Sequence, residues 1–306
     1  MKKINLSTLL LLLITNLIAQ HSSSDIAGMN LKGMVLSIEE RSYTAIDNFG
    51  KPVKGARAPD NSDHIFNKAG YHTEQNIYNK NGSLKVRYTY EYNEFGKLAE
   101  QVLYNPGGSM RSKITYKYNN NKQLVSQIQL KPNGTLITKY TYEYNVAKNL
   151  IAYYWYNEEG VLDEKYEYEY DTAGNQTMES SFNADGSLNS KIKFLYDVNS
   201  NVVEETITTL NDSATVNTSY SYNSNGKLTS KIVHNAVGKL NSKYTYRYDV
   251  QHNMIEHLVY NQDDEQIDAY TYKYDYDKTG NWVKKLIYRN GLPEIMVEKE
   301  LTYYKN

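Results

Sequence analysis

The chain contains no cysteine, and its 306 residues include only 5 prolines, 5 phenylalanines and 2 tryptophans. A chain without cysteine cannot be a disulfide scaffold, so packing alone must hold the fold together. Neither sign of charge is in large excess, because 34 basic residues stand against 35 acidic ones. Nucleic acid phosphates call for a basic patch, and we therefore expect no nucleic acid partner.

Long apolar runs are absent after the first 20 residues. Lys2 and Lys3 precede an apolar stretch that ends at Ala19, and a polar segment begins at Gln20. This pattern predicts a secretory signal peptide over residues 1–20, cut near Ala19 or Gln20. An uncleaved anchor is the alternative, although the stretch is short for a span of about 20 residues. Cleavage leaves 32 basic residues (34 less two lysines) against 35 acidic ones, in a secreted or periplasmic protein with no membrane span.

Tyrosine is the residue in excess, with 32 copies, and eight of them recur at a constant step of 26 residues. These periodic tyrosines are Tyr92, Tyr118, Tyr144, Tyr170, Tyr196, Tyr222, Tyr248 and Tyr274. A period between about 20 and 50 residues is typical of repeat proteins, in which each unit buries its apolar face against its neighbours. A weaker copy begins at Phe66, so we assign residues 66–306 to one repeat domain.

Each 26-residue unit carries two turn signals. One follows the periodic tyrosine, as at residues 171–175, and the other lies about halfway along, as at residues 183–188. Asn or Asp opens these turns and Gly supplies a positive φ. The segments between turns alternate, with Tyr166, Tyr168 and Tyr170 on one face and Glu167 and Glu169 on the other. This period of two predicts one antiparallel β-hairpin per unit.

The fold class is therefore all-β, an antiparallel meander of about 17–19 strands. We expect an extended curled or spiral sheet with the tyrosine face concave or inward, and a flat ribbon is the alternative. Residues 21–65 should supply N-terminal capping strands over 32–46 and a loop over 50–63. The last hairpin should turn at Asn290-Gly291, and the atypical ends should cap the stack.

The pattern Tyr-x-Tyr-Asp-x-x-Gly-Asn, clearest at residues 168–175, resembles the YD repeat of the Rhs family. The resemblance covers about residues 66–304 and implies strands that wind into a shell or spiral. Large members enclose toxins or form parts of cell-surface proteins, and glycan binding has been associated with some of them. This chain carries no evident toxin domain or Rhs core segment, so it is most similar to the small secreted YD-repeat proteins of Bacteroidetes-type bacteria.

Signals for catalysis or metal binding are weak. No nucleophile elbow, phosphate loop or dinucleotide fingerprint is present. His252 and His257 are five residues apart on one strand, so they point to opposite faces. Residues 275–280 resemble the start of a calcium loop, but no acidic residue follows at 283–287, where the loop would close. We expect no enzymatic activity, no cofactor and no metal.

The aromatic columns are the one surface with a clear binding chemistry, because aromatic rings stack on sugars and hydroxyls bond to them. The richest cluster is Tyr153, Tyr154, Trp155 and Tyr156, and Trp282 at an exposed turn is a second candidate. The alternative is packing, since cross-strand pairs stabilise a sheet by about 0.2–1 kcal/mol each. The sequence predicts a secreted, non-enzymatic module that binds a polysaccharide or an envelope protein. A purely structural spacer, or a remnant of a larger Rhs-type system, is the alternative.

Overall fold

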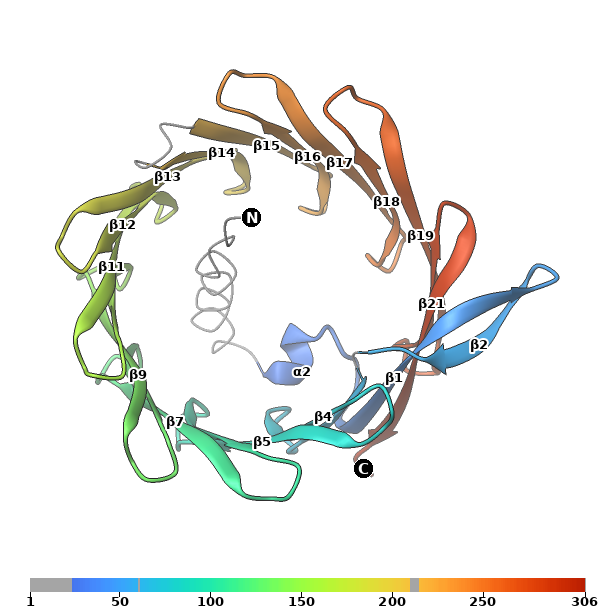
Figure 1. Ribbon diagram of the computed structural model, residues 1–306, viewed down its shortest axis with the longest axis horizontal. Coiled ribbons are helices and arrows are strands. Elements are labelled where there is room, and N and C mark those ends of the chain that lie inside the picture. Colours follow the sequence, from blue (N-terminus) through green and yellow to red (C-terminus); the bar gives the residue numbers. More distant parts are fainter. Residues whose placement is uncertain (1–23, 60, 210–214, 306) are drawn as a thin grey trace.

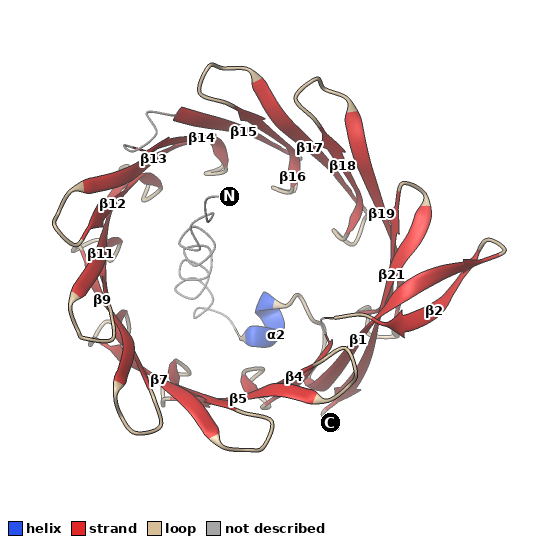
Figure 2. Cartoon of the chain, in the orientation of Figure 1, coloured by secondary structure: helices blue, strands red, loops and turns tan. Residues whose placement is uncertain are grey.

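The structure is a computed structural model that describes residues 24–59, 61–209 and 215–305. The predicted signal peptide, residues 1–20, and its cleavage site lie outside the described residues. Within the described ranges the chain consists of antiparallel strands and a short helix, α2 (Asp25–Gly28) (Figure 2). No helix in these ranges has the length and apolarity needed to span a membrane.

Twenty-one strands follow one another along the described residues. They are β1 (Val35–Asn48), β2 (Lys51–Arg57), β3 (Asn61–Phe66), β4 (His72–Tyr78), β5 (Leu84–Tyr92), β6 (Leu98–Tyr104), β7 (Met110–Tyr118), β8 (Leu124–Leu130), β9 (Leu136–Tyr144), β10 (Leu150–Tyr156), β11 (Leu162–Tyr170), β12 (Gln176–Asn183), β13 (Leu188–Tyr196), β14 (Val202–Thr209), β15 (Thr215–Tyr222), β16 (Leu228–His234), β17 (Leu240–Tyr248), β18 (Met254–Tyr260), β19 (Gln266–Tyr276), β20 (Trp282–Arg289) and β21 (Leu292–Tyr303). The predicted hairpin repeat is confirmed, with more strands than the 17–19 expected.

The sheet closes into a cylinder (Figure 1). Strand β1 pairs with β21, from Val35 opposite Tyr303 to Thr44 opposite Ile295, and its other edge pairs with β3. Among the described strands β2 pairs with β1 alone, and the other 20 form a continuous ring. The expected open, curled or spiral sheet is therefore wrong. The terminal strands do not cap a stack, because pairing with each other satisfies the backbone groups that two open edges would expose.

The stretch expected to be a loop, residues 50–63, instead contains β2 and the first half of β3. Strand β2 and the end of β1 form a hairpin that projects outward from the ring (Figure 1). Pro52 fits there because an edge strand can lack one N–H group. Gly55 is required because a side chain at this position would collide with Thr44 and Ile46. An edge hairpin thus tolerates the residues that suggested a loop.

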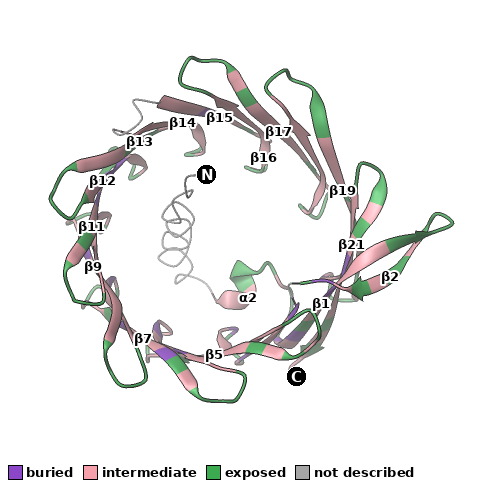
Figure 3. Cartoon of the chain, in the orientation of Figure 1, coloured by how far each residue is buried: buried purple, intermediate pink, exposed green. Residues whose placement is uncertain are grey.

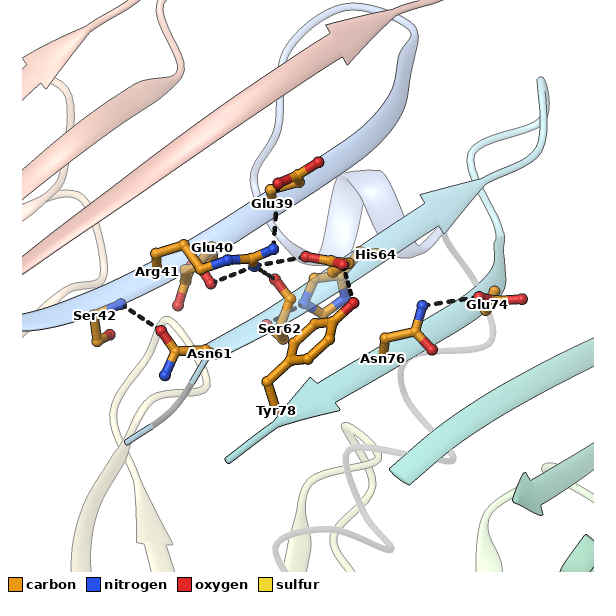
Figure 4. Close-up of polar contacts among 11 residues, drawn as sticks. Glu39, Glu40, Arg41, Ser42, Asn61, Ser62, His64, Glu74, Asn76 and Tyr78 are labelled. Carbon is orange, nitrogen blue, oxygen red and sulfur yellow. Dashed lines mark hydrogen bonds and ion pairs between the residues drawn. The ribbon is translucent and has the colours of Figure 1, made fainter. Parts of the chain in front are cut away.

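Polar side chains also join β1 to β3 (Figure 4). We call this junction between β1 and β3 the seam. Arg41 on β1 donates from Nη1 to the Asp63 carboxylate at 2.6 Å and to the Ser62 carbonyl at 3.0 Å. The buried Asn61 amide accepts a hydrogen bond from the Ser42 backbone N–H at 3.0 Å. His64 Nε2 lies 3.0 Å from the Ser62 hydroxyl. The seam is therefore held by side chains as well as by the strand ladder.

The periodic tyrosines line the inner face of the ring. Helix α2 lies inside the ring in Figure 1, and its Asp25 carboxylate accepts a hydrogen bond from the Tyr92 hydroxyl at 3.0 Å. The main core belongs to the same face and comprises Leu98, Tyr116, Leu124, Tyr140, Tyr142, Tyr153, Tyr166 and Tyr168. Lys117, Glu143 and Arg247 are exposed, and each alternates with tyrosines along its strand, so they lie on the other face. The predicted inward direction of the tyrosines is confirmed.

The two ends of the cylinder differ. The turns that follow the periodic tyrosines, such as residues 223–227 and 249–253, lie toward the centre in Figure 1, and we call this end the narrow rim. The alternate turns, such as residues 235–239, flare outward and form the wide rim (Figure 1). Both sets close with the hydrogen bonds predicted for Asn- or Asp-initiated turns, as from the Gly226 N–H to the Asn223 carbonyl at 3.0 Å.

Seven periodic tyrosines form the same hydrogen bond. Each hydroxyl donates to the carbonyl of the residue 20 positions earlier, at 2.6 to 2.9 Å. The pairs are Tyr118–Leu98, Tyr144–Leu124, Tyr170–Leu150, Tyr196–Gln176, Tyr222–Val202, Tyr248–Leu228 and Tyr274–Met254. Each bond joins neighbouring strands at the narrow rim, which explains why this position holds tyrosine and not phenylalanine.

Tyr170→Phe should lower the free energy of unfolding by about 1–2 kcal/mol, because the Leu150 carbonyl loses a hydrogen-bond partner. The matched control is Tyr104→Phe, since the Tyr104 ring lies under the Arg87 guanidinium at 4.4 Å and keeps that contact. The control should change stability by less than about 0.5 kcal/mol. Urea unfolding of both variants measures the difference, and equal losses would show that the repeated hydroxyl contributes nothing.

Candidate ligand pocket

The segment before β1 crosses the seam on the inner side of the ring. At its start, the Ile26 N–H donates to the Gly70 carbonyl at 3.0 Å. At its end, the Lys32 N–H donates to Asn281 Oδ1 at 2.8 Å, and Asn281 Nδ2 donates back to the Lys32 carbonyl at 2.9 Å. Asn281 is buried and follows the turn at residues 277–280. These bonds fix residues 29–32 against the narrow rim.

A pocket of about 190 Å³ lies between this segment and two neighbouring turns of the narrow rim. Its lining includes the aromatic side chains of Tyr276 and Trp282, the amides of Asn30, Gln251 and Asn253, and the ammonium group of Lys32. None of the described lining residues is Asp or Glu. The pocket thus combines flat apolar rings with amide donors and acceptors and includes the basic residue Lys32.

Hydrogen bonds orient the polar side of the pocket. The Asp249 carboxylate accepts from the Asn253 backbone N–H at 2.8 Å and from the Tyr276 hydroxyl at 3.1 Å. Asn253 Nδ2 in turn donates to the Tyr276 hydroxyl oxygen at 2.7 Å. Burial, followed by the charge of Asp249, raises the pKa of Tyr276. Asn253 and Tyr276 are therefore held in place before any ligand arrives, which lowers the ordering cost of binding.

Trp282 is the first residue of β20 and is half-buried, so it is not the exposed turn residue that the sequence suggested. The Lys299 ammonium lies 3.5 Å from the indole centroid and that of Lys285 lies at 5.1 Å. Burial lowers the pKa of Lys299, although the Glu40 carboxylate at 3.3 Å opposes this shift. Cations attracted to the ring hold the indole in a fixed orientation beside the pocket.

The other predicted aromatic cluster is divided between the two faces of β10. Tyr153 is 3% exposed on the inner face and stacks on Tyr166 with centroids 4.5 Å apart. Trp155 also packs against the inner core. Tyr154 and Tyr156 lie on the outer face, where each ring is covered by a lysine ammonium. The structure therefore does not bring the four residues together, and Tyr153 belongs to the core.

The amide residues of the pocket were not predicted, although one irregularity in the sequence marks their place. The repeat gains two residues near Tyr274–Asp277, and β19 is accordingly 11 residues long where β17 has 9. The added length places Tyr276 next to Asn253 on the neighbouring turn. The two-residue insertion into the repeat was therefore the sequence feature that could have located the pocket.

Two histidine sites lie outside the pocket. His64 Nδ1 lies 3.0 Å from His72 Nε2, and burial, together with the charge of His72, lowers the pKa of His64 to about 4. His257 is stacked between tyrosine rings, with Tyr246 at 4.9 Å. Within residues 24–59, 61–209 and 215–305, no group of three or more His, Asp or Glu side chains is arranged to hold a metal.

No protein-family profile matches the chain, and no curated protein is similar to it. Among solved structures, a porin-like protein from Bacteroides uniformis is 14% identical over 88% of this chain and 98% of that chain, with a TM-score of 0.35. The structure of TcdB2-TccC3-Cdc42 is 11% identical over 88% of this chain and 18% of that chain, with a TM-score of 0.34. This chain therefore spans a small part of that protein. TM-scores of this size assign neither a family nor a function.

Proposed function

We propose that this chain is a secreted, non-enzymatic binding protein of the cell envelope, and that its narrow-rim pocket takes one sugar unit of a polysaccharide. The observation that carries the proposal is the joint presence of Trp282, Tyr276 and four amide residues around one pocket. The resemblance to YD-repeat proteins, some of which are associated with glycan binding, agrees with it. Secretion rests on the predicted signal peptide.

The lining suits the chemistry of a sugar. A sugar ring has C–H faces that pack on aromatic rings, and hydroxyls that both donate and accept hydrogen bonds. An amide offers a donor and an acceptor on one group, so the side chains of Asn30 and Gln251 match such hydroxyls. The Asn253 amide nitrogen already donates to Tyr276 and Asp249, so Asn253 offers its amide oxygen as an acceptor. The pocket of about 190 Å³ is smaller than the roughly 300–1,000 Å³ of sites for drug-sized ligands. Lys32 favours neutral or acidic sugars over cationic ones.

A structural role is the second candidate. It is favoured by the tyrosine hydroxyls, seven of which bond to backbone carbonyls, and by the burial of Tyr153. These eight tyrosines are thereby explained by the stability of the fold, which does not explain the pocket at the narrow rim. A spacer would bind no polysaccharide at all, which separates the two candidates.

The proposal is tested with the mature chain, residues 21–306, on the insoluble cell envelope and on a panel of polysaccharides. Gln251→Ala should weaken binding about tenfold, because one hydrogen bond to the ligand is lost. Gln251 is exposed, so the variant should fold normally. Trp282→Ala should weaken binding further. Asn225→Ala, at the same position of the neighbouring narrow-rim turn, is the control and should bind normally.

Retained binding in the Gln251 and Trp282 variants would place the ligand elsewhere on the ring. Binding to none of the polysaccharides would favour the structural role.

A further inference from the structure

The hairpin of β1 and β2 ends in an exposed phenylalanine with an unfavourable backbone conformation. Phe49 is 101% exposed, and its φ of 51° is followed by a φ of 79° at Gly50. Two successive positive φ values are typical of a type I′ turn, which prefers Asn-Gly. A bulky residue rarely adopts a positive φ. Neither packing nor the turn itself therefore explains a phenylalanine at position 49.

Another hairpin of this chain has the same backbone conformation at its turn, but with the preferred residues Asn-Gly. The hairpin between β20 and β21 turns at Asn290 and Gly291, with φ of 50° and 82°. Asn290 also donates from Nδ2 to the Asp268 carboxylate and accepts from the Ala269 N–H, so it contributes to the fold. Phe49 is fully exposed, so its ring gains no packing that would offset the backbone strain. The contrast indicates that the Phe49 side chain acts on something outside the folded chain.

The surroundings of Phe49 are apolar and basic. Ile46 and Val53 form a cross-strand pair behind the tip, and their exposures are 53% and 39%. Strand β2 carries three basic residues, Lys51, Lys54 and Arg57, while Asp47 is the acidic residue near the tip and accepts from the Gly50 N–H at 2.9 Å. The Lys54 ammonium is paired with the Glu298 carboxylate of β21 at 2.5 Å. Three basic groups therefore stand against two acidic ones, which leaves the hairpin with a small positive charge in a chain whose formal net charge is −1.

A second strand is a poor partner for this hairpin. The free edge of β2 carries Pro52, which cannot donate a hydrogen bond, and exposed Lys51 and Lys54, a combination that discourages strand addition. The tip projects outward from the ring (Figure 3), so Phe49 is free to insert into an adjoining surface.

From these observations we propose that the β1–β2 hairpin docks on an anionic lipid bilayer. Phe49 inserts at the boundary between headgroups and acyl chains, and Lys51 beside the tip lies against the anionic headgroups. The hairpin extends beyond the wide rim, whereas the sugar pocket lies at the narrow rim (Figure 1). Both sites can therefore be occupied at once, and docking does not depend on the sugar proposal.

The test is co-sedimentation of the mature chain with vesicles. Phosphatidylcholine vesicles containing about one-third phosphatidylglycerol should bind the chain, and pure phosphatidylcholine should bind it about tenfold more weakly. Phe49→Asn should reduce binding to the anionic vesicles about tenfold. The same change should leave the urea midpoint equal or higher, because Asn-Gly is the preferred turn. Loss of binding by this variant therefore cannot be ascribed to unfolding.

Val237→Asn is the matched control, since Val237 is also exposed at a wide-rim turn. It should bind vesicles like the unmodified chain. Normal binding by Phe49→Asn, equal losses in both variants, or no binding to anionic vesicles would each overturn the proposal. A dimer that dissociates on Phe49→Asn, seen by sedimentation velocity without lipid, would overturn it in favour of a second copy of the chain.

Discussion

Replacing Phe66 with alanine should lower the free energy of unfolding by about 3–5 kcal/mol. Phe66 is 1% exposed and packs with Val35 and Ile38, both fully buried, at the seam that closes the ring. It also stacks on His72 with centroids 4.4 Å apart. Alanine would leave a cavity where β1 meets β3, and the closed strand ladder on both sides of β1 prevents the cavity from collapsing.

Phe95→Ala is the control for this change, because Phe95 lies largely exposed in a narrow-rim turn and contacts the Lys122 ammonium at 4.5 Å. It should cost less than about 1 kcal/mol. Urea unfolding followed by circular dichroism gives both values. A small loss for Phe66→Ala would mean that the seam is not a packed part of the fold, and closure of the ring would then be in doubt.

Glu179→Gln should stabilise the protein by about 3 kcal/mol at pH 8 and by little at pH 4. Glu179 is 5% exposed on the inner face. Burial first, and then the charge of Glu205, raises its pKa to about 7 from an ordinary value of 4.5. Between about pH 4.5 and pH 7, Glu179 therefore holds a proton in the folded chain that it has released in the unfolded chain. Stability therefore falls as the pH rises from 4.5 to 7, and glutamine removes that loss.

The control is Glu167→Gln, because Glu167 is half-exposed on the outer face beside Lys165. Removing a surface ion pair should cost less than about 1 kcal/mol. Glu167→Gln should not become more stabilising as the pH rises from 4 to 8. Unfolding free energies of both variants across this range separate them, and a Glu179→Gln effect that is the same at both ends would contradict the raised pKa.

The hairpins could be predicted from the sequence because their determinants are local. The turn at Asn290-Gly291 is confirmed, and so is the Gly position of each narrow-rim turn. Four units carry another residue at that position and adopt the same positive φ, between 62° and 69°: Lys122, Lys148, Ser200 and His252. A side chain there is strained, but the neighbouring strands fix the turn regardless.

Closure of the ring could not be predicted in this way. It depends on the curvature summed over all strands and on pairing between residues 35–44 and 295–303, which no periodic signal connects. The pocket has the same origin, since its residues come from before β1 and from turns more than 200 positions later. The sequence could have predicted that Tyr153 and Tyr154 lie on opposite faces of the sheet, because neighbours on one strand point to opposite faces.

The most direct measurement of the central claim is the fluorescence of Trp282 during a sugar titration. The chain has 2 tryptophans, so Trp155→Phe leaves Trp282 as the sole reporter. Oligosaccharides of a polysaccharide that the chain retains should change its emission in a saturable manner, and Gln251→Ala should shift the midpoint about tenfold. An unchanged emission with an oligosaccharide that demonstrably binds the chain would place recognition outside the pocket.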